Sequence, residues 1–306
     1  MKRLIGCVGY IERPQFEFDS LSDRLQVESM LAARQDDILT VHWDDLDSSL
    51  ATSRAFDVRR GSWTSADLSQ ADALLILEAP APGSTSADFD HADALMRLLV
   101  QLRMPAVNSP RTFLEYPDKR YLVERPDMPF PTTRLVTAKS DLPRALEGLG
   151  ETVILKPLIG AGGEGVTRLP AVADTVRQAM EPGQEYLIQE FLPEIAHGER
   201  SLYFFAKRYR YAIVKRPQAD DFRCNDIYAV NERYEPTPEE MAIASDAIER
   251  FNSPSLIERI DMCGTKIIEM TIECPGLWVA LCDIQKEIGV WTYEAIDRAI
   301  AEAAAD

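Results

Sequence analysis

The sequence lacks the features that mark membrane-spanning and disulfide-stabilised proteins. No stretch approaches the roughly 20 consecutive apolar residues that a membrane-spanning helix requires. The opening segment MKRLIGCVGYIERP reaches Pro14 and polar residues too early for a secretory signal peptide. The cysteines number five and contain no CxxC pair, so neither a disulfide framework nor a zinc site is predicted. We therefore expect a cytoplasmic protein whose cysteines are reduced and mostly packed in the core.

Basic residues are scarce relative to acidic ones. The 33 Lys and Arg residues face 50 Asp and Glu residues, which gives a net charge of −17. Nucleic acids and anionic membranes are bound mainly through Lys and Arg, so neither is an expected partner. A phosphate ligand would need a local basic pocket in this acidic chain. The three histidines, His42, His91 and His197, lack the spacing of metal ligands or of a catalytic triad, and surface or capping roles are expected.

Alternating strand and helix patterns fill the first third of the chain. Strand patterns at 3–10, 38–43 and 72–79 are separated by helix patterns at 20–34 and 88–103. Strands joined through helices by short connections are typical of a parallel sheet covered on both faces. The remaining expected strands are 130–136, 152–157 and 185–192, two antiparallel strands within 201–217, and two strands around a Cys-Gly turn within 256–275. The remaining expected helices are 112–125, 140–149, 171–180, 239–251 and 293–305.

A glycine-rich segment, LKPLIGAGGEGV (155–166), follows one of these strands and contains Gly160, Ala161, Gly162, Gly163, Glu164 and Gly165. Glycines let backbone N–H groups converge on an anion, and Lys156 adds a point charge for the same phosphate. The sequence has no GxxxxGK[ST] motif, and GAGGEG does not follow the first strand as a dinucleotide fold requires. A glycine-rich hairpin turn without a ligand remains an alternative.

Two carboxylates, Asp261 and Glu269, lie on predicted strands joined by a Cys-Gly turn. Paired carboxylates can hold Mg²⁺, which prefers oxygen ligands and substrate phosphates. A solvated strand pair is the alternative, but both residues lie in apolar runs, where an unpaired charge is costly. Two further basic candidates are Lys119, in the predicted helix at 112–125, and Lys215, at a strand end. Taken singly, each lysine could also be an ordinary surface charge.

Seven segments between Asn108 and Gly276 together resemble the ATP-grasp ligases, and most closely their glutathione synthetase-like branch. In order they are NSP with DK, ILKPLIGAGGEGV, IQEFLPEI, GERSLYFF, AIVKRP, DFRCN and RIDMCGTKIIEMT. The segments GERSLYFF and KRP followed by DFR are also similar to the cyclo-ligases that close O-ureido-D-serine to cycloserine.

The resemblance implies an ATP-grasp fold, α/β overall and α+β in the C-terminal part. It implies a pre-ATP-grasp domain with a parallel sheet at 1–110, a central subdomain carrying the glycine loop at 111–190 and a C-terminal subdomain with a metal site at 191–306. It further implies ATP and two Mg²⁺ ions as cofactors, and small amino-acid-like carboxylates and amines as substrates. An amide would form through an acyl phosphate, with ADP and phosphate released. A homo-oligomer remains open.

Site roles follow from the resemblance position by position. Lys119, Lys156 and the glycine loop are expected at the phosphates and adenine, the backbone of Glu190, Phe191 and Leu192 at the adenine edge, and Glu199 at the ribose. Lys215, Arg223 and Asn225 are expected at the phosphate and substrate, and Asp261, Glu269 and Thr271 at the metal. The segment around Arg223 also has simpler interpretations. Arg223 could pair with Asp220 or Asp221, and Cys224 could be a packed thiol rather than a nucleophile.

The sequence also departs from the family pattern. The usual E-x-N metal pair is Glu269-Met-Thr271, so a hydroxyl, water or Glu273 would complete the metal site. The glycine pair that often follows RxN is replaced by YAVNERYEP (228–236), which predicts a remodelled substrate loop and an acceptor other than that of glutathione synthetase. A kinase on the same scaffold and a nucleotide-binding regulator without turnover are the alternatives to a ligase.

Overall fold

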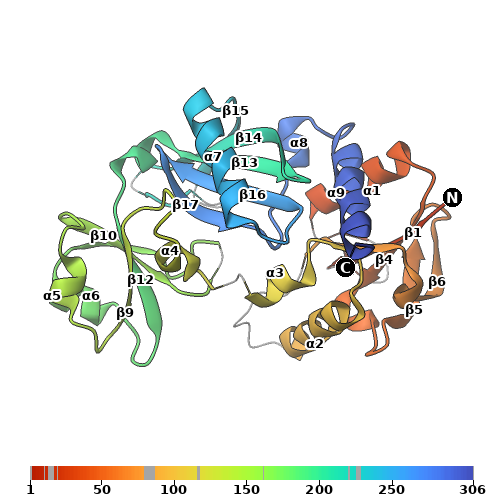
Figure 1. Ribbon diagram of the computed structural model, residues 1–306, viewed down its shortest axis with the longest axis horizontal. Helices are drawn as coiled ribbons and strands as arrows, with labels where there is room; N and C mark the ends of the chain where they lie inside the picture. The colour runs from red at the N-terminus through yellow and green to blue at the C-terminus, as the bar shows by residue number, and fades with distance from the viewer. Residues whose placement is uncertain are drawn as a thin grey trace.

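Three main sheets form the molecule (Figure 1). The computed structural model describes residues 2–9, 11–12, 17–18, 20–78, 87–115, 118–160, 162–219, 221–224 and 229–305. In Figure 1 the C-terminal sheet lies between a small sheet at one end and the N-terminal sheet at the other. A two-stranded ladder, β2 (Ile11–Glu12) with β3 (Glu17–Phe18), adjoins the N-terminal part.

The N-terminal sheet has the strand order β6-β5-β4-β1-β7-β8. The central strand β1 pairs in parallel with β4 and β7, and its buried, apolar residues give it cover on both faces. The predicted parallel sheet is thus confirmed. The antiparallel hairpin β5–β6 at its edge was not predicted. The strand bounds are β1 Leu4–Gly9, β4 Asp37–His42, β5 Ala51–Asp57, β6 Ser62–Asp67, β7 Ala73–Ile76 and β8 Ala106–Val107.

Helices α1, α2 and α9 belong to this N-terminal sheet. The C-terminal helix α9 packs against α1 and contacts β7 and β8, so the last helix of the chain lies on the N-terminal part (Figure 1). One continuous core joins the N-terminal sheet and helix α1 to the C-terminal sheet, including Ile5 and Val27 on one side and Tyr203 and Ile213 on the other. The bounds are α1 Leu21–Ala33, η1 Trp43–Asp45, η2 Leu68–Gln70, α2 Ala87–Leu102 and α9 Ile288–Ala303.

The small sheet is antiparallel, in the order β11-β10-β12-β9. Two short helices pack on it, and α5 begins where the Asp141 carboxylate accepts a hydrogen bond from the Arg144 N–H. Its core is separate from that of the N-terminal sheet. The bounds are β9 Thr133–Thr137, α5 Leu142–Leu146, β10 Thr152–Pro157, β11 Thr167–Pro170, α6 Ala173–Gln178 and β12 Glu185–Glu190.

The C-terminal sheet is antiparallel, in the order β15-β14-β13-β16-β17. Helix α7 begins with a capping box between Thr237 and Glu240, and it ends at Asn252 in the left-handed conformation. Its apolar face packs in the same core as α4 and the sheet. The bounds are η3 Pro193–His197, β13 Glu199–Phe205, β14 Arg208–Pro217, β15 Ala229–Tyr234, α7 Pro238–Phe251, β16 Ile257–Cys263, β17 Lys266–Thr271 and α8 Val279–Cys282.

The prediction of a single helix at 112–125 is wrong. The structure has two short helices, α3 (Pro110–Glu115) and α4 (Tyr121–Glu124), with Lys119 in the turn between them. Pro117 stands between the two helices in the sequence, and a proline inside a helix removes a backbone hydrogen bond. Asp118 instead forms a β-bridge with Ile159, which brings the segment to the glycine loop.

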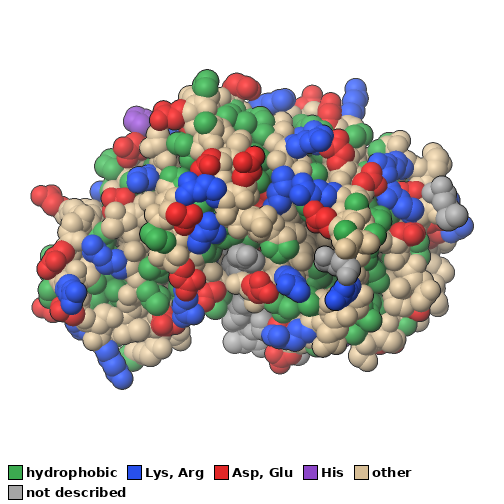
Figure 2. All heavy atoms as spheres, in the orientation of Figure 1, with side chains coloured by type: hydrophobic (Ala, Val, Ile, Leu, Met, Phe, Trp, Pro, Cys, Tyr) green, Lys and Arg blue, Asp and Glu red, His purple; other side chains and the backbone are tan. Residues whose placement is uncertain are grey.

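The described helices include none with both the length and the apolar character needed to cross a membrane. On the face drawn in Figure 2, Lys and Arg side chains are interspersed with Asp and Glu.

Candidate functional site

A cavity of about 690 Å³ opens between the small sheet and the C-terminal sheet. The N-terminal part contributes Glu78 and Phe113 to its wall. Of the residues predicted for the site, the cavity is lined by Lys156, Gly160, Gly162, Gly163, Glu190, Phe191, Leu192, Glu199, Lys215, Arg223, Asp261, Glu269 and Thr271. Tertiary folding therefore brings together residues that span more than a hundred positions of sequence. Ala161 and Asn225, which were also predicted, lie outside the described residues.

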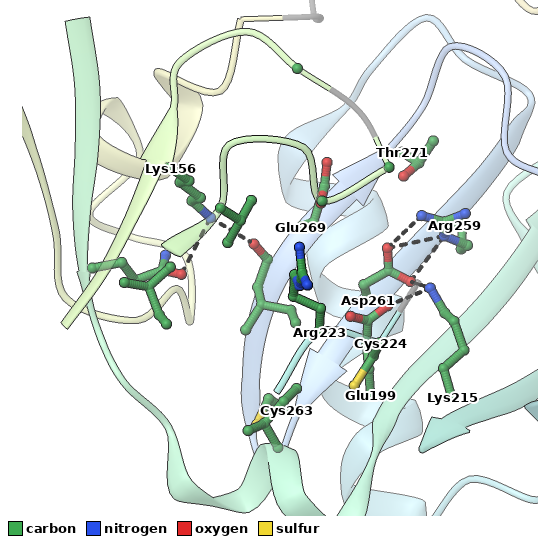
Figure 3. Close-up of a pocket in the computed structure, with 18 of the residues that line it drawn as sticks. Lys156, Glu199, Lys215, Arg223, Cys224, Arg259, Asp261, Cys263, Glu269 and Thr271 are labelled. Carbon is green, nitrogen blue, oxygen red and sulfur yellow. Dashed lines mark hydrogen bonds and ion pairs between the residues drawn. The ribbon is translucent and has the colours of Figure 1, made fainter. Parts of the chain in front are cut away.

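Lys156 lies on the buried floor of this cavity, near the end of β10 (Figure 3). Its Nζ donates to Gln189 Oε1 at 3.3 Å and to the Ile268 carbonyl at 3.5 Å. Burial lowers the pKa of Lys156 to about 8; Lys119 acts in the same direction, and Glu269 opposes the shift. The ammonium is therefore poorly solvated, and an anionic ligand in the cavity would stabilise it.

Lys119 lies beside the glycine loop rather than on the cavity wall. Its Nζ donates to the Gly160 carbonyl and is 3.6 Å from Glu269 Oε1. Gly162 and Gly163 have φ of 62° and 72°, a region that side chains with a Cβ rarely adopt. Glu164 and Gly165 belong to the same loop but are not among the cavity-lining residues. The loop is thus tied at one end by Lys119.

Apolar side chains form the part of the cavity next to the end of β12. Glu190, Phe191 and Leu192 lie there, and Phe191 has the Arg168 guanidinium 4.0 Å from its ring centroid. The Glu190 side chain accepts a hydrogen bond from the Thr132 N–H at 2.8 Å. The aliphatic residues that line the cavity are Ile154, Ile159, Val166, Leu192, Ile195 and Ile268. A flat aromatic base would find an apolar slot here with backbone groups at its edge.

Four charged side chains meet on the C-terminal sheet (Figure 3). Glu199 on β13 pairs with Lys215 on β14, opposite which it lies in the strand register. Asp261 on β16 receives the Arg259 guanidinium, with Nε 2.9 and 3.0 Å from its two oxygens and one terminal nitrogen 2.8 Å away. Lys215 Nζ is 3.6 Å from Asp261 Oδ1, and Ser201 Oγ donates to the same oxygen.

This cluster contains two cations and two carboxylates in a buried place. Burial favours the neutral form of Asp261, but Arg259 and Lys215 outweigh it and lower the pKa of Asp261. Burial raises the pKa of Glu199, although Lys215 opposes that shift. Asp261 is therefore ionised and held by fixed donors, as a buried carboxylate must be.

Glu269 lies opposite Asp261 in the register of β16 and β17, as the predicted carboxylate pair requires. Its side chain is 39% exposed, whereas that of Asp261 is 2% exposed. Thr271 and Glu273 line the same wall of the cavity. Burial raises the pKa of Glu273, and the charge of Glu269 adds to the effect. The oxygens around Glu269 suit a hard cation, which would relieve this repulsion.

The surroundings of Asp261 do not suit a cation in the same way, because both of its oxygens already accept from Arg259. Within the described residues there is no group of three His, Cys, Asp or Glu side chains placed to hold a metal ion.

Arg223 lines the cavity and also pairs with Asp221. Its Nε lies 3.2 and 3.3 Å from the two Asp221 oxygens and a terminal nitrogen lies 2.9 Å from one of them. The simpler interpretation of Arg223 is thus present in the structure, while Asp220 is outside the described residues. Burial raises the pKa of Cys224 to about 12, so its thiol is protonated, as expected for a packed cysteine.

Sequence reasoning missed Arg259, Gln189, Glu78 and Phe113. A signal for Arg259 existed, because alternate residues of a strand face the same way and Arg259 precedes Asp261 by two. The three histidines are not among the cavity-lining residues; His91 Nε2 contacts the Trp43 and Leu46 carbonyls instead.

Comparison with known proteins gives the family. The family described as prokaryotic glutathione synthetase, ATP-grasp domain, matches residues 118–287, more than half of the chain. The chain belongs to this ATP-grasp family. The match begins at Asp118 beside the glycine loop and includes every charged residue of the cluster around Asp261. The resemblance found in the sequence is therefore confirmed.

Curated relatives and solved structures agree with this membership. The glutathione synthetase of Bradyrhizobium diazoefficiens is 27% identical over 187 residues, 55% of this chain and 55% of the relative. That of Nitrosomonas europaea is 30% identical over 164 residues, 52% of this chain and 50% of the relative. The chain thus spans about half the length of these relatives.

Likeness to solved structures extends over nearly the whole chain. The D-cycloserine synthetase DcsG has a TM-score of 0.66 at 17% identity, over 96% of this chain and 99% of that chain. The D-alanine–D-alanine ligase from Bacillus anthracis has a TM-score of 0.62 at 14% identity, over 99% of both chains. At these identities the likeness shows the ATP-grasp fold, which confirms the predicted fold class.

Proposed function

We propose that this protein is an ATP-dependent carbon–nitrogen ligase. It would join a carboxylate to an amine on small amino-acid-like molecules, or cyclise one such molecule. The observation that carries the proposal is the convergence of Lys156, Lys215 and Arg223 on one cavity beside the glycine loop. The lining also contains carboxylates, among them Glu199 and Asp261, but in a chain of net charge −17 these cations are the groups in the cavity that can contact a triphosphate.

The cavity offers a separate place for each part of the nucleotide. The apolar slot beside Glu190, Phe191 and Leu192 takes the adenine, and the Glu199 carboxylate takes the ribose. Lys156 and the glycine N–H groups take the phosphates, since fixed donors and cations stabilise phosphoryl oxygens. Lys119 holds the glycine loop through the Gly160 carbonyl. Closure of the glycine loop would exclude water, which otherwise hydrolyses an activated acyl group.

The reaction proceeds in two steps. A carboxylate oxygen of the substrate attacks the γ-phosphorus of ATP, the bond to the β,γ-bridging oxygen breaks, and ADP leaves. The amine then attacks the acyl carbon of the acyl phosphate, loses a proton, and inorganic phosphate departs. Lys215 and Arg223 stabilise the negative charge that develops on the phosphoryl and carbonyl oxygens.

Mg²⁺ would neutralise charge on the transferred phosphoryl group when it is bound. Glu269, with Thr271 and Glu273 beside it, is the part of the wall that fits an ion.

The two carboxylates Glu78 and Glu273 line the same cavity as Arg223. Groups of both charge signs favour a substrate that carries both an ammonium and a carboxylate, such as an amino acid or its derivative.

The test is a screen for ADP and phosphate release with amino acids and their ureido, hydroxamate and dipeptide derivatives. We expect ADP and phosphate in equal amounts, and only when both a carboxylate and an amine are available. A phosphorylated product that accumulates without an amine would show a kinase instead. ATP binding without turnover for any compound in the screen would instead support a nucleotide-binding regulatory protein. Arg208→Ala, an exposed change at the far end of β14, is the control variant and should retain full turnover.

A further inference from the structure

We propose that the Arg259 guanidinium takes the place of one metal ion, so that the protein works with a single Mg²⁺ held on the Glu269 side of the cavity. This inference rests on the proposed ATP-dependent activity. It departs from the two ions that the family resemblance implies.

The first argument is the occupancy of Asp261. Its two oxygens accept from Arg259 at 2.8–3.0 Å, and Ser201 adds a further donor. The Asp261 side chain is only 2% exposed. A Mg²⁺ ion needs an oxygen lone pair at about 2.0–2.1 Å. It could reach Asp261 only by displacing a guanidinium that is itself buried against the sheet.

The second argument is charge. Arg259 and Lys215 balance Asp261 and Glu199 within one cluster of ion pairs (Figure 3). No net negative charge is left there to attract a divalent cation, and the two fixed cations repel one at short range. Removing either cation would leave a buried carboxylate uncompensated, which is the condition under which a metal ion binds.

The third argument is the position of Arg259. It lines the cavity as well as facing Asp261, so its planar guanidinium can offer donors to a phosphate while Asp261 holds it in place. Asp261 then acts as a positioning residue for Arg259. On the opposite strand, Glu269 is more exposed, with Thr271 and Glu273 next to it. One or two carboxylates with substrate phosphates are enough for one Mg²⁺.

The experiment counts bound ions directly. Mn²⁺ replaces Mg²⁺ and is titrated into protein held in excess over adenylyl imidodiphosphate, with free Mn²⁺ measured by electron paramagnetic resonance. We expect one Mn²⁺ per bound nucleotide in the unmodified protein. Two ions per nucleotide would overturn the inference and leave the proposed function standing. Failure of the nucleotide to bind would overturn both.

Variants test whether Arg259 is the cause. Arg259→Gln should bind a second, weaker Mn²⁺, because Asp261 then loses its bidentate partner. A count that stays at one would overturn the role of Arg259. Arg259→Lys, which keeps the charge, should stay at one ion and provides a second test if the glutamine variant does not fold. Arg208→Ala, on the same sheet and exposed, is the matched control and should also bind one ion.

Discussion

At the scale of single residues, Lys156 should make nucleotide binding depend on pH. Its pKa is lowered to about 8, first by burial, with Lys119 adding and Glu269 and Glu199 opposing. Below that pH Lys156 is mostly a charged ammonium that can bind a phosphate directly. Above it Lys156 is mostly a neutral amine, which must take up a proton when the nucleotide binds. ADP affinity should therefore fall by up to about tenfold per pH unit above pH 8.

Calorimetry of ADP binding between pH 7 and 9.5 checks this expectation. Lys156→Gln should bind ADP more weakly and lose the pH dependence that Lys156 adds. Burial also raises the pKa of Glu199, so Glu199 can add a pH dependence to both proteins. Subtracting one profile from the other removes that shared contribution. Parallel profiles in the two proteins would show that Lys156 does not contact the nucleotide.

Arg223 tests the chemical step at the same scale. If it leaves Asp221 to hold the substrate carboxylate and the developing oxyanion, Arg223→Ala should reduce kcat by about 10²–10³-fold. Lysine should substitute poorly, because it lacks the planar pair of donors. ATP affinity, set mainly by Lys156 and the end of β12, should change little. Near-normal turnover would mean that Arg223 only pairs with Asp221.

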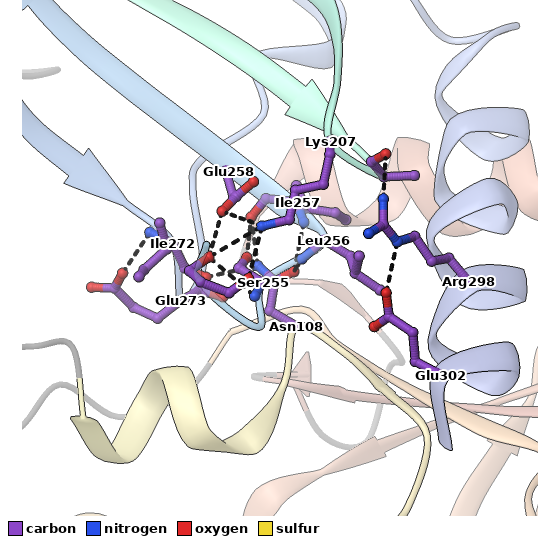
Figure 4. A network of polar contacts seen from close by, with 12 residues as sticks. Asn108, Lys207, Ser255, Leu256, Ile257, Glu258, Ile272, Glu273, Arg298 and Glu302 are labelled. Carbon is purple, nitrogen blue, oxygen red and sulfur yellow. Dashed lines mark hydrogen bonds and ion pairs between the residues drawn. The ribbon is translucent and has the colours of Figure 1, made fainter. Parts of the chain in front are cut away.

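At the scale of elements, Asn108 joins the loop after β8 to both ends of the β16–β17 hairpin (Figure 4). Its Nδ2 donates to the Ile257, Ile272 and Glu273 carbonyls at 2.6–3.1 Å. Its Oδ1 accepts from the N–H groups of Leu256 and Ile257 at 3.0 and 2.7 Å. One buried amide therefore sets where Glu273 enters the cavity wall.

Asn108→Ala should lower the free energy of unfolding by about 2–4 kcal/mol, because several buried backbone groups lose a side-chain hydrogen-bond partner. Asn108→Asp keeps the acceptor toward Leu256 and Ile257 but loses the donors, and it places a buried carboxylate against carbonyl oxygens. It should be destabilised as well. Urea denaturation measures both, and an alanine variant as stable as the unmodified protein would contradict this account.

At the scale of the whole molecule, the last helix, α9, packs on the N-terminal part of the chain. A Cβ on Gly289 would lie 2.4 Å from the carbonyl carbon of Ser29 and 2.5 Å from its oxygen, both backbone atoms of α1. The Gly289 N–H donates to Ser29 Oγ at 2.9 Å, and Gln26 bonds Thr292 at 2.9 Å across the same interface. Helices α1 and α9 can approach this closely only with glycine at the contact.

Gly289→Ala should force the helices apart and cost about 1–3 kcal/mol, the range for overpacking. Thermal unfolding followed by circular dichroism checks it. Gly276→Ala is the matched control, because a Cβ there would meet no atom within 4 Å. Equal melting temperatures for the two variants would show that the α1–α9 contact yields without cost.

Local patterns predicted much of this protein. Alternation and turn residues predicted the β13–β14 and β16–β17 hairpins, and the glycine run with Lys156 predicted a phosphate loop beside a strand end. The carboxylate pair Asp261 and Glu269 follows from the same local geometry. These features depend on residues a few positions apart, whose relative placement the backbone period already sets.

Tertiary structure decided the rest. Asn108 finds its partners 148–165 positions away, and Lys119 lies in a turn at the glycine loop instead of in the helix that the pattern predicted. The neighbours of Asp261 come from β13 and β14 as well as from its own strand. Whether Asp261 binds a metal ion or pairs with Arg259 therefore depends on which strands lie side by side. Charge pairing and close helix contact are set by distance in space, and that distance is a property of the whole packed chain rather than of any segment.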